Sequence, residues 1–144
     1  MTRIRARTHL VAVTLRSQTR KAVIPARLSR TLNQVRAVGK RFTDAPHAGV
    51  TDEIDLLVRR RILGHAAHQL ATAIETALET TGEPSLETHL DALNTIGVNH
   101  HATAQDLATE AHTLTRHARE ITYMAKQSPR IATVMADHLE RNPC

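Results

Sequence analysis

Arginine is the residue type with the greatest chemical potential in this 144-residue chain, because its planar group is permanently charged and donates several hydrogen bonds to an anion. Sixteen of the nineteen basic residues are arginine. Eleven of the nineteen lie between Met1 and Thr43, where no Asp or Glu occurs, so this segment carries a charge of +11 while the remainder carries −6. Such an uninterrupted run of positive charge is typical of a protein that binds an anionic partner.

Three kinds of partner fit a basic segment: nucleic acid, an anionic membrane and an acidic protein surface. Nucleic acid is the commonest of them, and we expect it here. An arginine-rich segment without acids is also typical of a mitochondrial presequence, which stays an alternative. Because no apolar run reaches the roughly 18 residues of a membrane-spanning helix, we expect a soluble, cytoplasmic protein that does not engage a membrane.

The low aromatic content of the chain limits the ways in which it can bind nucleic acid. Phe42 and Tyr123 are its only Phe, Tyr or Trp residues, so stacking of bases on aromatic rings is not expected to be the main mode. Contacts from arginine and lysine to phosphate remain, and these do not read base sequence. The choice between RNA and DNA stays open. The expected phosphate donors are Arg16, Arg20, Lys21, Arg27, Arg30, Arg36, Lys40 and Arg41.

A second basic cluster occupies positions 59–61 of the chain. Three consecutive helical residues fan over about 200° of the helix surface, so they cannot all face one nucleic-acid backbone. We expect Arg59 and Arg60 to join the binding surface. In an equally weighted alternative, Arg60 extends its side chain out of an apolar seam, while Arg59 and Arg61 pair with Asp55 or Asp52.

Histidine is the other abundant residue with catalytic or metal-binding chemistry, with ten copies. His65 and His68 are three residues apart, but no third metal ligand is evident near them. His117 and Glu120 have the reverse of the Glu-x-x-His order of di-iron bundles. We therefore interpret the histidines as polar surface positions, apart from His100 in an apolar seam, and expect neither a metal nor another cofactor. No nucleophile-elbow or phosphate-loop pattern occurs, which favours a noncatalytic protein.

The elements that position these residues are predicted to be helices of one domain, residues 1–144. After Pro25, apolar residues recur at helical spacing and predict a helix of about 13 residues that ends at Gly39, with a loop over 40–50. Within the acid-free segment 1–43, residues 8–15 fit either a strand or a buried helix. The apolar positions of the expected helix are Leu28, Leu32, Val35 and Val38.

Residues 51–128 are predicted to form a long antiparallel helical hairpin, the core of an all-α bundle. The first arm is near thirty residues long, from a cap at Thr51 to Gly82, and Ser85 caps the second arm, which is expected to break at 97–101. Ser128 and Pro129 begin a short last helix over 129–141. The first seam is Leu56, Leu63, Ala67, Leu70, Ile74 and Ala77; the second is Leu86, Leu90, Leu93, Gly97, His100, Ala104, Leu107, Ala111, Leu114, Ala118, Ile121 and Ala125.

A small, basic, helical and aromatic-poor chain of this kind resembles the small helical subunits of CRISPR effector ribonucleoproteins. The resemblance covers the whole chain and rests on its size, the basic stretch RSQTRKAVIPARLSRTLNQVRAVGKR and the Ala/Leu hairpin. It implies a role in antiviral defence without catalysis. It also implies contacts with guide RNA or with target or displaced DNA, with neighbouring subunits and with further copies of the chain.

Two other functions remain open. If residues 10–15 form a strand, the chain resembles the ribbon-helix-helix DNA-binding proteins of plasmids, including relaxosome accessory factors, although that fold turns into its first helix sooner. Alternatively, the chain is a helical scaffold whose heptad seams bind a partner helix while the basic segment contacts an acidic protein. A scaffold of this kind is expected to lose binding on Leu107→Asp and to respond little to the charge of the segment.

Overall fold

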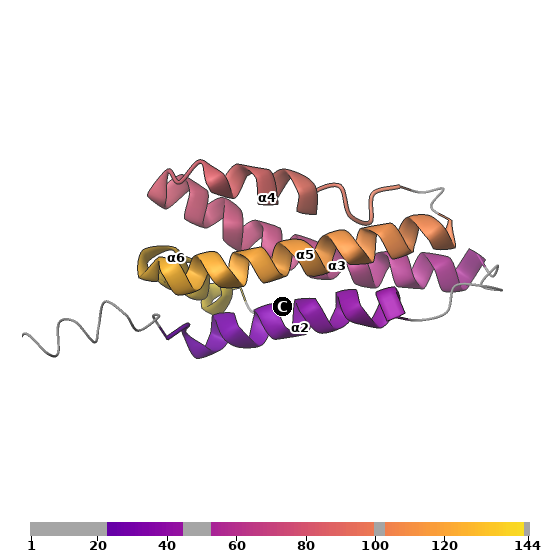
Figure 1. The fold of residues 1–144 in the computed structure, drawn as a ribbon, viewed down its shortest axis with the longest axis horizontal. Coiled ribbons are helices and arrows are strands. Elements are labelled where there is room, and N and C mark those ends of the chain that lie inside the picture. Colours follow the sequence, from indigo (N-terminus) through magenta and orange to yellow (C-terminus); the bar gives the residue numbers. More distant parts are fainter. Residues whose placement is uncertain (1–22, 45–52, 100–102, 143–144) are drawn as a thin grey trace, which may run out of the picture.

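The computed structural model describes residues 23–44, 53–99 and 103–142, and this part of the chain is all-α (Figure 1). The predicted fold class is confirmed. Residues 8–15, whose conformation the sequence leaves open, lie outside the described ranges. None of the described helices is long and apolar enough to span a lipid bilayer. The helices are α2 (Ala26–Asp44), α3 (Glu53–Thr81), α4 (Ser85–Leu93), α5 (Ala104–Gln127) and α6 (Pro129–Arg141).

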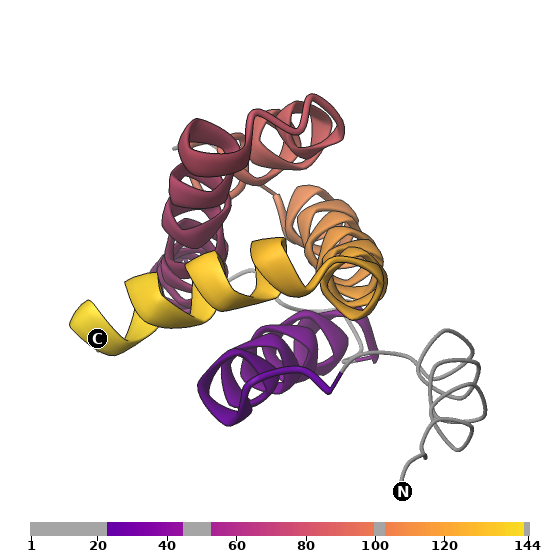
Figure 2. The same ribbon diagram turned by 90° about the vertical axis from the view of Figure 1, so that its left-hand side faces the viewer.

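The helices form a bundle in which α2, α3, α4 and α5 run along the long axis and α6 crosses one end (Figures 1 and 2). Helices α3 and α4 form an antiparallel hairpin joined by residues 82–84. Helix α5 lies beside α2, and these two share the most extensive contact between any two of the described helices. The prediction of a hairpin over 51–128 is therefore wrong for its second half. The antiparallel hairpin consists of α3 and α4, whereas α5 turns back after the break, runs in the same direction as α3 and packs mainly on α2 (Figure 1).

The core lies where the predicted seams meet. The Leu and Ile residues of the seams are enclosed between helices, and the Ala residues between them let the helix backbones approach. Leu56 and Leu90 are only partly buried, and His100 lies outside the described ranges. Most of the predicted seam is thus confirmed. Its fully buried Leu and Ile residues are Leu63, Leu70, Ile74, Leu86, Leu93, Leu114 and Ile121.

The predicted break in the second arm is confirmed. Helix α4 has nine residues, and α5 begins after Thr103, whose hydroxyl accepts a hydrogen bond from the Asp106 amide while the Asp106 carboxylate accepts one from the Thr103 amide. This reciprocal capping box satisfies two amides at the start of α5. The prediction of a Ser85 cap is wrong, because Ser85 is the first residue of α4 and its hydroxyl donates to the Glu83 carboxylate at 3.0 Å.

Gly39 does not end the first helix, contrary to the prediction, because α2 continues through it to Asp44. Its lack of a side chain serves packing instead. A Cβ atom at this position would overlap the Thr115 hydroxyl and lie 3.1 Å from the Ala111 carbonyl oxygen of α5. Burial against α5 outweighs the cost of a helical glycine, which is about 1 kcal/mol relative to alanine. Gly39 therefore marks the close approach of α2 and α5.

We expect Gly39→Ala to lower the free energy of unfolding by about 1–3 kcal/mol, because the added methyl group must push α5 away. In a helix free of neighbours the same change would stabilise by about 1 kcal/mol, so the sign of the effect reports the packing. Urea unfolding of Gly39→Ala, Thr115→Ala and the double variant measures the coupling. The explanation fails if Gly39→Ala stabilises the protein, or if Thr115→Ala does not reduce its effect.

Among the described histidines, three make contacts that link helices. His138 links α6 to α3, since its Nδ1 atom lies 3.0 Å from the Thr76 hydroxyl and its Nε2 atom 3.2 Å from the Thr72 hydroxyl. His89 and His117 are 9% and 4% exposed and meet between α4 and α5. The interpretation of the histidines as surface positions is therefore wrong for His89 and His117. Their sequence separation of 28 residues hides a contact that exists only once α4 packs against α5.

Candidate nucleic-acid interface

Helix α2 carries an apolar face and a basic face. Leu28, Leu32 and Val35 recur at intervals of four and three residues and are buried. The basic residues fall between these positions, so folding the apolar face into the core turns them outward. Of the expected phosphate donors, Arg30, Arg36, Lys40 and Arg41 are exposed on this helix.

The other expected donors of the acid-free segment differ in their placement. Arg16, Arg20 and Lys21 lie outside the described residues. Arg27 is half-buried, and its buried Nε atom has no hydrogen-bond partner among the residues that the structure describes. Arg27 is therefore less accessible to a nucleic acid than Arg30, which belongs to the same helix.

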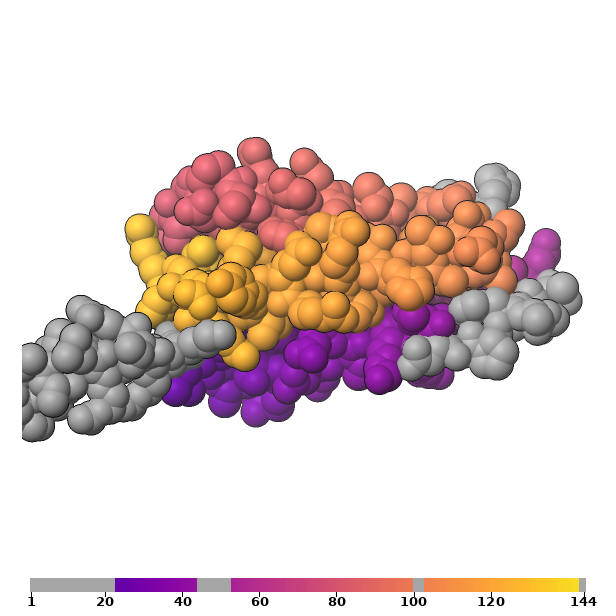
Figure 3. Space-filling view, viewed as in Figure 1, coloured from indigo at the N-terminus to yellow at the C-terminus, as the bar shows by residue number. Residues whose placement is uncertain are grey.

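An open hollow of about 510 Å³ lies between α2 and α5. Figure 3 looks onto the face where these two helices lie side by side. Arg36 and Lys40 line the hollow from α2, and His112 and Arg119 line it from α5. The described residues that line it include no carboxylate, so an anion in it would meet only positive or neutral groups of this part of the chain. The neutral lining residues are Asn33, Ala37, Thr43 and Thr115.

A second hollow on α5 adjoins the first, because both are lined by His112, Thr115 and Arg119. It adds Arg116, and the described part of the chain again contributes no carboxylate to its lining. We call the residues Arg36, Lys40, His112, Arg116 and Arg119 the basic groove. Within the described ranges, none of its arginines or its lysine forms an ion pair with a carboxylate. These charges are therefore available to a negatively charged ligand.

Sequence reasoning missed the half of the basic groove that α5 contributes. His112, Arg116 and Arg119 lie in the part of the chain with net negative charge, so the charge distribution pointed away from them. Their spacings of four and three residues place them on one side of a helix, and this signal is visible in the sequence. The packing of Gly39 on α5 turns this side of α5 toward α2.

Arg59 and Arg60 are held by contacts within the chain. The Arg59 Nε atom lies 3.0 Å from an Asp55 carboxylate oxygen, which is the pairing that the alternative interpretation contained. An Arg60 guanidinium nitrogen donates to the Asn99 carbonyl oxygen at 3.3 Å. Neither arginine lines the basic groove.

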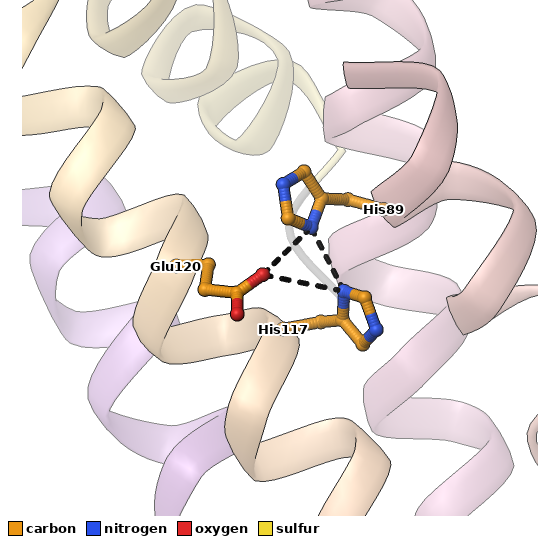
Figure 4. Close-up of side chains that lie close together, drawn as sticks. All are labelled: His89, His117 and Glu120. Carbon is orange, nitrogen blue, oxygen red and sulfur yellow. Dashed lines mark hydrogen bonds and ion pairs between the residues drawn. The ribbon is translucent and has the colours of Figure 1, made fainter. Parts of the chain in front are cut away.

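A buried polar cluster lies on another side of α5. The Nδ1 atoms of His89 and His117 are 2.8 Å apart, and a Glu120 carboxylate oxygen lies 3.6 Å and 4.0 Å from them (Figure 4). A guanidinium nitrogen of Arg116, which can only donate, lies 3.3 Å from the Nε2 atom of His117. This contact assigns the His117 proton to Nδ1, from where it is donated to Nδ1 of His89, so both rings are neutral.

Burial lowers the pKa of both histidines below the ordinary value of 6.5. Arg116 lowers the pKa of each further, His89 also lowers that of His117, and the Glu120 carboxylate opposes the shift. The unfolded chain therefore takes up these protons at higher pH than the folded chain. The free energy of unfolding is therefore not reduced by these two groups above pH 6.5, and it decreases as the pH falls below 6.5.

We expect the free energy of unfolding to fall when the pH is lowered from 7.5 to about 5.5. Each of the two histidines contributes a loss of up to about 1.4 kcal/mol for every pH unit below 6.5. Urea unfolding across this range measures the loss. A His89→Gln/His117→Gln variant removes both groups and is expected to lose less stability than the natural chain. Equal losses in the two proteins would contradict this assignment.

Comparison of the chain with protein-family models, with curated proteins and with solved structures finds no match. The geometry of the basic groove and the sequence are thus the basis for the functional interpretation.

Proposed function

We propose that the protein is a noncatalytic subunit that binds the sugar-phosphate backbone of nucleic acid through the basic groove and the acid-free N-terminal segment. The observation that carries the proposal is the convergence of Arg36 and Lys40 of α2 with Arg116 and Arg119 of α5 along two adjoining hollows, whose described lining residues include no carboxylate. Arginine and lysine donate charge-assisted hydrogen bonds to phosphate oxygens, which stabilise binding and depend on salt concentration.

The dimensions of this surface suit a nucleic-acid strand better than a single small anion. Helix α2 has 19 residues and is therefore about 28 Å long, comparable to about eight base-pair steps of a duplex at 3.4 Å each. Its exposed cations extend from Arg30 to Arg41, over most of this length. Arg36 and Lys40 share one side of this helix, so a strand that follows α2 can contact phosphates at both.

Binding without base recognition is supported by the placement of the two aromatic residues. Phe42 is buried, with 3% of its surface exposed, and is therefore unavailable for stacking on a base. Tyr123 is 59% exposed, but a single ring provides no platform for successive bases. Contacts to phosphate are therefore proposed to dominate, with little dependence on base sequence.

Membership of a larger ribonucleoprotein, as the resemblance to small CRISPR effector subunits implies, forms the finer part of the proposal. An apolar patch at the start of α3 supports a neighbouring protein subunit, because Ile54, Leu57 and Val58 share one helix face and are 71%, 43% and 48% exposed. The heptad seams are less suited to a partner helix. Leu107 and Leu114 are buried in the chain's own core, and a partner could reach them only by opening the bundle.

Binding of the purified full chain to random-sequence RNA, single-stranded DNA and duplex DNA tests the proposal. Salt is titrated from about 50 to 200 mM, and we expect affinity to fall steeply with salt and to differ little between sequences. The ranking of the three nucleic acids decides which one the subunit contacts. Sequence-dependent binding to duplex DNA alone would replace the proposal with the ribbon-helix-helix interpretation, and no binding at 50 mM salt would overturn it in favour of an acidic protein partner.

A further inference from the structure

His89, His117 and Glu120 bring three metal-ligating groups together at the contact of α4 and α5, with their ligand atoms within 4.8 Å of one another. We propose that these three side chains bind one divalent transition-metal ion of the zinc class and that the ion fastens α4 to α5. The site adjoins the basic groove through the contact of Arg116 with His117, but the metal proposal does not depend on phosphate binding by the groove.

The distances between the ligand atoms are close to those that a tetrahedral ion requires. Bonds of about 2.0–2.2 Å to nitrogen and oxygen place the ligands of a tetrahedral zinc ion about 3.3–3.5 Å apart. The observed separations are 2.8 Å between the two Nδ1 atoms, and 3.6 Å and 4.0 Å from these to the Glu120 carboxylate oxygen. Shifts of about half an ångström, outward for the imidazoles and inward for the carboxylate, complete the geometry.

The helices supply the ligands in a favourable arrangement. His117 and Glu120 are three residues apart on α5 and so lie on one face of the helix, where both side chains approach the same point (Figure 4). His89 completes the set from α4. The two imidazoles are buried, whereas the Glu120 side chain is 50% exposed, which provides an entry path and leaves a coordination position for water.

The protonation of the cluster also suits metal binding. Both imidazoles are neutral, as the hydrogen bond between their Nδ1 atoms requires, so an ion has to displace only the single Nδ1 proton of His117. The ion takes the place of the shared Nδ1 proton, and the His117 proton moves to Nε2. That change ends the contact with Arg116, whose exposed side chain is free to turn toward solvent.

Two imidazoles and one carboxylate indicate the class of ion. Nitrogen ligands favour Zn²⁺, Co²⁺, Ni²⁺ or Cu²⁺ over Mg²⁺ and Ca²⁺, which take oxygen ligands. The site has one carboxylate oxygen for two nitrogens, so it is expected to reject Mg²⁺. Because the ion bridges two helices of the folded chain, its binding is coupled to stability.

Titration of the metal-free full chain with Zn²⁺, followed by calorimetry, tests the site, and Co²⁺ provides a visible spectrum that reports tetrahedral coordination. We expect one equivalent of Zn²⁺ to bind with Kd in the micromolar range or below. At a hundredfold excess over Kd it is expected to raise Tm by roughly 5–10 °C. Mg²⁺ at the same concentration is expected to have no such effect.

Variants of the proposed ligands, compared with a variant of two other histidines, show whether the ion binds at this site. His89→Ala is expected to weaken Zn²⁺ binding by about a hundredfold, and Glu120→Gln by about tenfold or more. The half-exposed position of Glu120 makes its variant the one that preserves the fold. The control His65→Ala/His68→Ala removes two exposed imidazoles of α3 and is expected to retain full affinity.

Two results would overturn the proposal. One is the absence of a one-to-one complex with Zn²⁺ or Co²⁺ in the natural chain. The other is a complex that His89→Ala and Glu120→Gln leave unchanged while the control variant abolishes it, which would assign the ion to α3. Either result leaves the phosphate-binding proposal untouched, because that proposal is tested with metal-free protein and nucleic acid.

Discussion

Replacement of Arg36, Lys40 and Arg119 by alanine is expected to lower the affinity for random-sequence nucleic acid by about a hundredfold or more at 0.1 M salt. Each phosphate contact contributes about 0.7–0.9 to the slope of log K against log salt, so the triple variant should flatten this slope by two to three units. The three residues line the hollow between α2 and α5, and their exposed side chains contribute little to the core. Binding isotherms at several salt concentrations provide both numbers.

A control with the same loss of charge distinguishes the groove from net charge alone. Arg61, Arg130 and Arg141 are exposed basic residues that do not line the basic groove. Their triple alanine variant has the same net charge as the groove variant and is expected to lose several-fold less affinity. Equal losses in the two triple variants would show that the basic groove is not the binding surface. A variant that changed base preference at constant salt slope would contradict backbone binding.

Gly97→Ala is expected to lower the free energy of unfolding by about 3 kcal/mol or more, which is a large part of the stability of a small domain. Gly97 has φ of +82°, a conformation that costs an L residue about 1–2 kcal/mol. A Cβ atom there would also lie 2.6 Å from Gly64 Cα and 3.2 Å from the Arg60 carbonyl oxygen of α3. Both neighbours are backbone atoms, so the α4–α5 connection must move away from α3 to relieve the overlap.

Two control variants at other glycines distinguish the cost of the backbone conformation from the cost of atomic overlap. Gly82 has φ of +69° but no atom within 4 Å of its Cβ position, so Gly82→Ala is expected to cost only about 1 kcal/mol. At Gly64, inside α3, the added atom would lie 3.4 Å from Gly97 Cα, an ordinary contact, so Gly64→Ala is expected to stabilise the protein by up to about 1 kcal/mol. Urea unfolding of the three variants measures these differences. A Gly97→Ala effect no larger than that of Gly82→Ala would contradict the backbone overlap.

Much of the fold follows from local patterns in the sequence. The apolar spacing of α3 and α5 predicts their buried positions because a helix repeats every 3.6 residues, whatever lies around it. Helix α6 begins at Pro129, as predicted, and Ser128 is its N-cap, since a serine before proline satisfies an amide at a helix start in almost any context. The break after α4 follows from the glycine within 97–101. These signals act within a few residues of the chain.

Interactions between distant residues explain what the sequence did not reveal. Gly39 has the local signature of a helix end, but burial against Thr115 of α5 keeps it inside α2. Arg59 differs from these cases, because its partner Asp55 lies only one helical turn away in the sequence. The sequence allows either this ion pair or nucleic-acid binding, and the structure contains the ion pair. His89 and His117 have no local signal at all, because each resembles an ordinary surface histidine of its own helix.

Composition and periodicity alone determined that this protein is a helical bundle with a concentrated positive charge and few aromatic residues, since these properties depend on residue types and short spacings. Tertiary structure decided which faces meet. The pairing of α2 with α5 joins Arg36 and Lys40 to Arg119, and the pairing of α4 with α5 joins His89 to His117. The pairing of α2 with α5 depends on the fit of Gly39 against Ala111 and Thr115, a property of two surfaces together that neither stretch of sequence contains.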